Sequence, residues 1–109
     1  GLSSYIKAEI VDSSHIKCKL GKFVSNMGQN KVGDEVDLLI RPDDIIHDDD
    51  SLFSAKVIEK KFRGSDFLYE LELKDKQKIF CYAPSHHNHD INEVIGITLD
   101  LDHLIFFNN

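Results

Sequence analysis

The sequence lacks tryptophan altogether and holds only one methionine, two prolines and two cysteines among its 109 residues. The cysteines, Cys18 and Cys81, are too few and too far apart for the disulfide framework of a small secreted domain, so we expect reduced, buried thiols. No run approaches the roughly 18 to 20 apolar residues of a membrane span, and residues 1–5 lack the basic and apolar regions of a signal peptide. These absences predict one cytoplasmic domain, residues 1–109, whose core needs no cross-links.

Positive charge is also scarce, with 13 Lys and Arg against 19 Asp and Glu, for a formal net charge of -6. Proteins that bind the nucleic-acid backbone rely on Lys and Arg to displace counterions, so this balance opposes such a partner. Basic residues do gather at 56–63, beside Phe62 and Phe67, in a pattern that could stack single-stranded bases. A solvated strand face explains the same residues, and we expect no nucleic-acid partner.

Apolar residues alternate with polar ones in short runs, and Gly, Asn, Asp or Ser separates one run from the next. This period of two is typical of strands with one buried face, and helical spacing is nearly absent. The runs begin at the following apolar residues: Ile6, Ile16, Val36, Phe67, Ile79 and Ile95. The fold class is therefore expected to be all-β.

An internal repeat adds a second level of order. Residues 32–46 align with 91–105 without a gap, and residue 91 stands 59 positions after residue 32. The hairpin predicted at 6–20 aligns with 69–83, where the offset is 63 and the two cysteines share one slot. We interpret the chain as two tandem copies of a β-hairpin plus strand unit, about 5–46 and 68–105, linked by a strand at 52–62; chance alignment of alternating segments is the alternative. An OB-like barrel or a pair of fused small barrels follows, because closure removes exposed sheet edges.

Motifs for nucleotide, calcium or nucleophilic chemistry are mismatched. Gly28 and Gly33 have the spacing of a phosphate-binding loop, but Asp34 follows where such a loop needs lysine. The acidic run 43–50 does not begin a calcium-binding loop, because a loop that starts at Asp48 continues through Asp50 and Leu52 without the required glycine. Both cysteines fall at apolar positions, where burial keeps a thiol unreactive. We expect no catalytic residue and no cofactor in this chain.

Metal ligands are concentrated in residues 85–90, which contain His86, His87 and His89. Three imidazoles suit a borderline cation such as zinc. In an extended segment His87 and His89 share one side while His86 faces the other, so only a bent loop could gather all three. A solvated loop that happens to be rich in histidine accounts for the same residues, and the sequence favours it over a metal site.

The order of several short pieces resembles a known family. The pieces are VDLLIRPDDI at 36–45, FSAKV at 53–57, KFRGS at 61–65, YEL at 69–71 and LIFF at 104–107. In order and spacing they are similar to the C-terminal TOBE domain of ABC importer ATPases, over nearly the whole chain. Arg41-Pro42-Asp43 and Phe62-Arg63-Gly64 are the sharpest pieces. Within the family the chain looks most like the ferric-iron importers, although sugar and polyamine importers share the framework.

The resemblance implies an OB-like barrel attached to a nucleotide-binding domain, where it pairs two ATPase subunits and regulates transport. Walker A, Walker B and ABC signature motifs are missing from the sequence, so the resemblance does not make this chain an enzyme. ATP and magnesium are expected only in the nucleotide-binding domain. The implied partners are a second copy of the subunit, that nucleotide-binding domain and, indirectly, the membrane permease, at the cytoplasmic side of the inner membrane. A small-ligand or metal-sensing module is the alternative.

Two arginines match arginines of the family by position. We expect Arg41 and Arg63 to tie loops to carboxylates such as Asp43 or Asp66 rather than to contact a substrate.

Large apolar residues are in surplus near the C-terminus, at Leu104, Phe106 and Phe107. The resemblance implies pairing of subunits, and these three residues are the candidates for that interface.

Overall fold

The computed structural model describes residues 2–25, 28–100 and 105–108, the last four as backbone alone. The first of its two five-stranded sheets holds, in spatial order, β10 (Ile105–Asn108), β4 (Glu35–Ile40), β1 (Ser4–Asp12), β2 (His15–Cys18) and β3 (Gly21–Val24). The second holds β5 (Ile45–His47), β9 (Val94–Leu99), β6 (Ser54–Phe62), β7 (Asp66–Glu72) and β8 (Lys78–Pro84). The 3-10 turn η1 (Pro42–Asp44) precedes β5.

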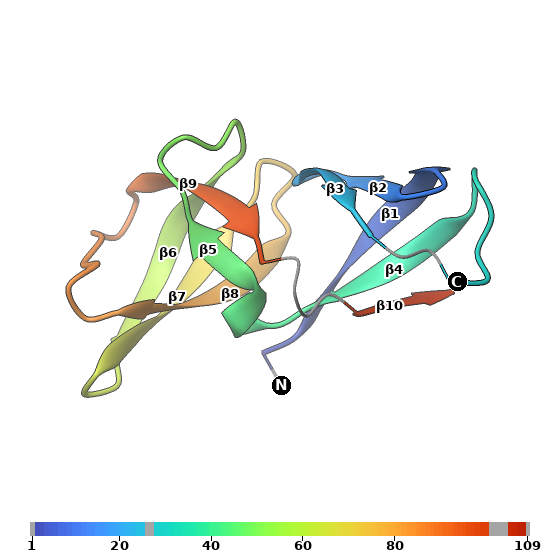
Figure 1. Ribbon diagram of the computed structural model, residues 1–109. Helices are drawn as coiled ribbons and strands as arrows, with labels where there is room; N and C mark the ends of the chain where they lie inside the picture. The colour runs from blue at the N-terminus through green and yellow to red at the C-terminus, as the bar shows by residue number, and fades with distance from the viewer. Residues whose placement is uncertain (1, 26–27, 101–104, 109) are drawn as a thin grey trace.

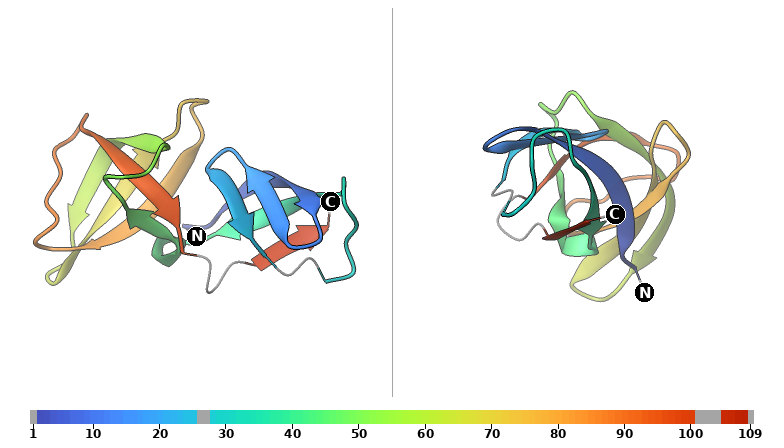
Figure 2. Two further views of the ribbon diagram at one scale, coloured as in Figure 1. Left: turned by 45° about the horizontal axis from the view of Figure 1, so that its top comes forward. Right: turned by 90° about the vertical axis from the view of Figure 1, so that its right-hand side faces the viewer.

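The two sheets lie side by side along a molecule of 42 × 23 × 22 Å (Figure 1). Seen from the end, the strands curl around the long axis, so that each sheet forms a small OB-like barrel (Figure 2). The expectation of an all-β chain built as a pair of fused small barrels is confirmed. No helix among the described residues is long and apolar enough to cross a membrane.

Alternating side chains build the core, as their period of two predicts. In β1, Ile6, Ala8 and Ile10 are buried, whereas Lys7 and Glu9 between them are exposed. Complete burial of an isoleucine side chain contributes about 1.5–3 kcal/mol, so a strand with two of them is held firmly to its sheet. The same inward and outward alternation runs through β4 and β9.

Each barrel receives one strand from the other half of the chain. β5 follows the strands of the first barrel but pairs with β9 in the second, where Ile46 lies opposite Thr98. β10 follows the strands of the second barrel but pairs with β4 in the first, where Ile105 lies opposite Leu39. Ile105 stands 59 positions after Ile46, and Thr98 stands 59 positions after Leu39. The two pairs therefore correspond, and the strand exchange is reciprocal with the same register in both barrels.

The turns that precede β4 and β9 obey the same offset. Gly33, with φ of 93°, donates its backbone N–H to the carbonyl of Ile10 at 2.7 Å. Asn92, with φ of 75°, donates its backbone N–H to the carbonyl of Val57, also at 2.7 Å. Glycine enters this left-handed conformation freely, and asparagine is among the residues that tolerate it best. These bonds make β1, which carries Ile10, the counterpart of β6, which carries Val57.

The sheet order supports this correspondence and differs from the alignment made on the sequence. The order is β4-β1-β2-β3 in one sheet and β9-β6-β7-β8 in the other. The first hairpin, β1 and β2, is therefore equivalent to β6 and β7 and not to β7 and β8. The segment 54–62 is thus a strand of the second barrel as well as the connection to it. Sequence alignment misses this because all alternating strands share one period, whichever neighbours they pair with.

Candidate functional site

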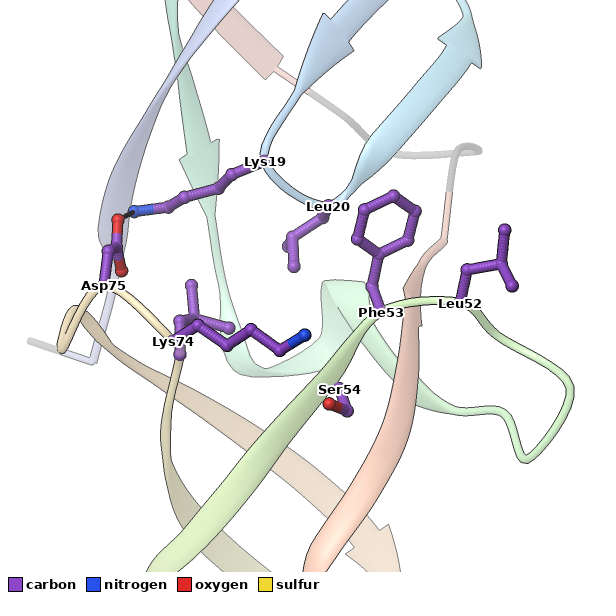
Figure 3. Close-up of a pocket in the computed structure, with 8 residues that line it drawn as sticks. Lys19, Leu20, Leu52, Phe53, Ser54, Lys74 and Asp75 are labelled. Atoms are coloured by element: carbon purple, nitrogen blue, oxygen red, sulfur yellow. Dashed lines mark hydrogen bonds and ion pairs between the residues drawn. The ribbon is translucent and has the colours of Figure 1, made fainter.

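A pocket of about 280 Å³ lies where the two barrels meet (Figure 3). Three loops supply its walls: the β2–β3 turn, the segment leading into β6 and the β7–β8 turn. Its lining residues are Lys19, Leu20, Leu52, Phe53, Ser54, Leu73, Lys74 and Asp75. The leucines Leu20 and Leu73 are buried in its floor, whereas Leu52 is 92% exposed at its mouth.

A glycine keeps the apolar wall of this pocket in place. Gly21 has φ of 130°, a conformation that side chains rarely adopt, and it turns the chain directly after Leu20. A Cβ at this position would lie 3.2 Å from ring atoms of both Phe53 and Phe23, so glycine lets the rings approach the turn closely. The β2–β3 turn of one barrel can therefore pack beside the Phe53 segment of the other.

Polar bonds join the barrels at one side of the pocket. Lys19 Nζ lies 2.6 Å from Asp75 Oδ2 and also donates to the Gln77 side chain. The hydrogen bond from Lys19, supplemented by the backbone N–H of Gln77, holds the pKa of Asp75 below its usual value. Gln77 Nε2 in turn donates to the carbonyl of Tyr5 at 2.8 Å. Lys19 is thus engaged in the joint between the barrels.

Lys74 differs from Lys19 in having its amine available. Figure 3 shows that the Lys74 side chain extends across the pocket, towards the side that holds Ser54 and Phe53. No described residue forms an ion pair or hydrogen bond with this amine. A cation above an apolar floor suits a small molecule that has an anionic group and an apolar body.

Arg41 ties a turn to a carboxylate, but the carboxylate is Asp44. The backbone N–H of Arg41 donates to Asp44 Oδ2 at 2.9 Å, and Arg41 Nε lies 3.3 Å from the same oxygen. Asp44 is 2% exposed, whereas Asp43 points to solvent. Asp44 takes this place because the 3-10 turn brings the third residue after Arg41 back over its backbone, whereas the expected contact of Arg41 with Asp43 stays a prediction.

Arg63 lies at the β6–β7 hairpin, away from the pocket. Its Nε is 3.6 Å from Asp66 Oδ1, and its guanidinium lies 4.3 Å from the centre of the Tyr82 ring. The hairpin turns at Gly64, which has φ of 98°. This arginine stabilises the hairpin through an ion pair and a cation–π contact, each a modest contribution at an exposed site.

The three C-terminal interface candidates lie outside the part of the chain that can be placed in full. Leu104 is outside the described residues. Phe106 and Phe107 are described only as backbone of β10, where they lie opposite Leu38 and Asp37 of β4. Their proposed role in pairing stays a prediction.

The histidine loop does bend, and it gains a fourth histidine that the sequence analysis missed. His47 at the end of β5 lies beside His87 and His89, with ring centres 5.9 and 4.6 Å away. His86 contacts His87 on the far side, at 4.4 Å between ring centres. Within the described ranges, no three His, Cys, Asp or Glu side chains already converge as ligands of one ion.

The cysteines are free thiols in apolar surroundings. Cys81 Sγ lies 3.2 Å from the carbonyl of Ile45, and burial raises its pKa to about 12. Burial also raises the pKa of Cys18. Because a thiolate is the reactive form, neither thiol is prepared to act as a nucleophile at neutral pH.

Comparisons with known proteins agree with this architecture. The model of the TOBE domain family matches residues 38–107, which is more than half of the chain. The spermidine/putrescine import ATP-binding protein PotA of Mycoplasmopsis synoviae (strain 53) is 29% identical over 112 residues, and the match covers 96% of this chain and 24% of that protein. The chain therefore spans about a quarter of the length of this curated relative.

A solved structure supports the fold alone. The cytoplasmic molybdate-binding protein ModG, in a crystal form with molybdate bound, superposes with a TM-score of 0.76 over 97% of this chain and 96% of that chain. Sequence identity is only 10%. The family match, the similarity to an importer's ATP-binding protein and the two-barrel fold together show that this chain belongs to the TOBE domain family.

Proposed function

We propose that this chain is the non-catalytic regulatory and dimerisation domain of the ATP-binding subunit of an ABC importer. The observation that carries the proposal is the match to PotA, in which 96% of this chain corresponds to 24% of an import ATP-binding protein. Walker A, Walker B and ABC signature motifs are not in this sequence, so ATP hydrolysis belongs to the remainder of such a subunit. The proposed partners are that nucleotide-binding domain, a second subunit and, through them, the permease at the cytoplasmic side of the inner membrane.

The two-barrel fold is suited to act as a rigid spacer between two nucleotide-binding domains. Because each barrel takes a strand from the other, the barrels cannot separate without breaking the β5–β9 and β10–β4 ladders. A two-fold pairing of such units would hold two ATPase subunits together while their nucleotide-binding domains open and close.

The test compares the full-length subunit with a truncated subunit that lacks these 109 residues. Sedimentation should show the truncated subunit dimerising about tenfold more weakly or worse, equivalent to about 1.4 kcal/mol or more. ATP turnover should persist in the truncated subunit but lose its coupling to the reconstituted permease. A truncated subunit that dimerises and couples like the full-length subunit would refute the proposal.

We propose polyamines as the solute class to be tested first, because the matched relative is named for spermidine and putrescine. The resemblance of the sequence to ferric-iron importers predicts iron instead. Uptake of labelled spermidine and of ferric iron, each measured with and without the subunit, separates the two. Loss of iron uptake with normal spermidine uptake would reject the polyamine assignment.

The pocket supports a second function, the binding of a small anionic effector. The free amine of Lys74 above an apolar floor is the feature that favours it. Anilinonaphthalene sulfonate has the required anionic group and apolar body, and its fluorescence should rise when it binds. Lys74→Gln should weaken binding by about threefold to tenfold, whereas Lys17→Gln, on an exposed strand position outside the pocket, should not. Equal binding by both variants would remove Lys74 from the site.

A further inference from the structure

Four of the six histidines gather at one end of the second barrel. His47 comes from β5, and His86, His87 and His89 come from the loop after β8. They meet because the strand exchange places β5 at the edge of the second sheet, next to β9. A hollow at this point is lined by the four histidines together with Asp49 and Asn88.

The backbone of the histidine loop is fixed in place by side chains of the barrel. The buried Tyr69 hydroxyl donates to the carbonyl of His87 at 2.7 Å and accepts the backbone N–H of His89 at 2.9 Å. Lys60 Nζ donates to the carbonyl of His89 at 3.0 Å and to Asn88 Oδ1 at 2.5 Å. The imidazoles are therefore carried by an anchored backbone, which a merely solvated loop does not require.

Two of the histidines each have one ring nitrogen against a carboxylate. His89 Nδ1 lies 2.8 Å from Glu93 Oε2, and His47 Nε2 lies 2.7 Å from Asp49 Oδ1. A carboxylate selects the tautomer that donates to it, which leaves the lone pair on the other nitrogen. Histidines that bind metal ions almost always donate their second nitrogen in this way.

The second ring nitrogen of His89, Nε2, is buried and makes no hydrogen bond to the described residues. Glu93 is itself held beside the ring, because its Oε1 accepts the backbone N–H of Asp90 at 3.0 Å. A buried acceptor without a donor is rare in folded proteins, and a cation would satisfy it.

The spacing of the rings fits one ion. A tetrahedral metal lies about 3.2 Å from each imidazole centre, given metal–nitrogen bonds of about 2.0–2.1 Å, so two ligand rings stand about 5 Å apart. The observed distances from His47, 4.6 Å to His89 and 5.9 Å to His87, fall on either side of that value. Because no three donors yet converge among the described residues, the half-buried His87 ring must rotate towards the other two.

We propose that His47, His87 and His89 bind a divalent transition-metal ion of the zinc class. The ion would join β5 to the loop after β8 and so fasten the exchanged strand to the second barrel. The fourth position is left for water or for His86. This site is separate from the pocket at Lys74 and goes beyond the proposed transport role.

The test is calorimetric titration of the whole chain with zinc. One ion should bind per chain, and His47→Gln and His89→Gln should each weaken binding by about tenfold or more. His15→Gln is the matched control, since His15 Nδ1 also lies 2.7 Å from a carboxylate, that of Asp12, but outside the cluster. Magnesium, which prefers oxygen ligands, should not bind.

The variant His87→Gln is expected to fold normally, because the Tyr69 hydroxyl bonds the backbone carbonyl at this position and not the side chain. This variant should keep the circular dichroism of the parent and still lose zinc affinity. Cobalt substituted for zinc should give the intense visible absorption of a tetrahedral site. Absence of zinc binding at about 100 µM, or equal binding by His87→Gln and His15→Gln, would overturn the proposal.

Discussion

Removing the hydroxyl of Tyr69 tests directly how the barrel holds the histidine loop. Tyr69→Phe keeps the ring and removes one oxygen, which donates to the carbonyl of His87 and accepts the N–H of His89. The side chain is 1% exposed, so the substitution opens no route for bulk water. Burial raises the pKa of Tyr69, which keeps the hydroxyl protonated as a donor at neutral pH.

The expected loss follows from the two bonds. Each neutral hydrogen bond contributes about 1 kcal/mol, and the unpaired backbone groups left behind add to the loss, for a total of about 2–3 kcal/mol. Unfolding entropy near 2.1 cal/mol/K per residue, over 109 residues, gives about 0.23 kcal/mol/K. The melting temperature should therefore fall by about 10 °C.

Urea and thermal unfolding followed by circular dichroism measure this loss, and Tyr82→Phe supplies the control. Tyr82 lies on the neighbouring strand β8, and its hydroxyl makes no hydrogen bond to any described residue. The control should stay within about 0.5 kcal/mol of the parent. If Tyr69→Phe behaved like the control, the loop would not depend on this hydroxyl and the reasoning would be refuted.

Three further changes test other features. Asp44→Ala removes the buried acceptor of the Arg41 N–H and should cost about 2–3 kcal/mol in urea titration; a change below about 0.5 kcal/mol would contradict that role. Gly96→Ala would press a Cβ against the carbonyl of Asp48, and a loss of about 1–3 kcal/mol is expected, so an unchanged urea midpoint would disprove the close approach. Burial raises the pKa of Cys81 from 9.0 to about 12. Between pH 9 and pH 12 the unfolded chain therefore loses the Cys81 proton while the folded chain keeps it. The contribution of the thiol to stability is complete below pH 9 and declines as the pH rises towards 12. The free-energy gap between parent and Cys81→Ala should narrow by up to about 1.4 kcal/mol per pH unit in that interval, and a constant gap would show a normal thiol.

Most strands could be predicted from the sequence, because the alternation that defines them is local, but β3 was not expected, since its four residues are too few to show the pattern. Val36, Leu38 and Ile40 were expected to share one face, and all three are buried. The partner of each strand could not be predicted in the same way. Every alternating strand offers the same ladder of N–H and C=O groups, so nothing local assigns β5 to the second barrel or β10 to the first.

The candidate sites show the same division. His87 and His89 were visible as a histidine-rich loop, whereas His47 had no local signal because its place depends on the strand exchange. The pocket was not visible either, since Leu52 and Phe53 cannot be told from core residues until the barrels are placed side by side. Of the two long-range signals, the repeat of residues 32–46 at 91–105 keeps its constant offset in the sheet registers, whereas the sheet order does not follow the alignment of 6–20 with 69–83.

Reciprocal exchange has a consequence for how such a protein could arise. A chain of half this length would form a sheet of four strands with one edge left unpaired. Its last strand would have no partner within the same sheet. Two identical copies would satisfy each other about a two-fold axis, as β5 and β10 do here within one polypeptide. The molecule thus has the form of an intertwined homodimer written as one polypeptide, in which the two halves carry different surfaces.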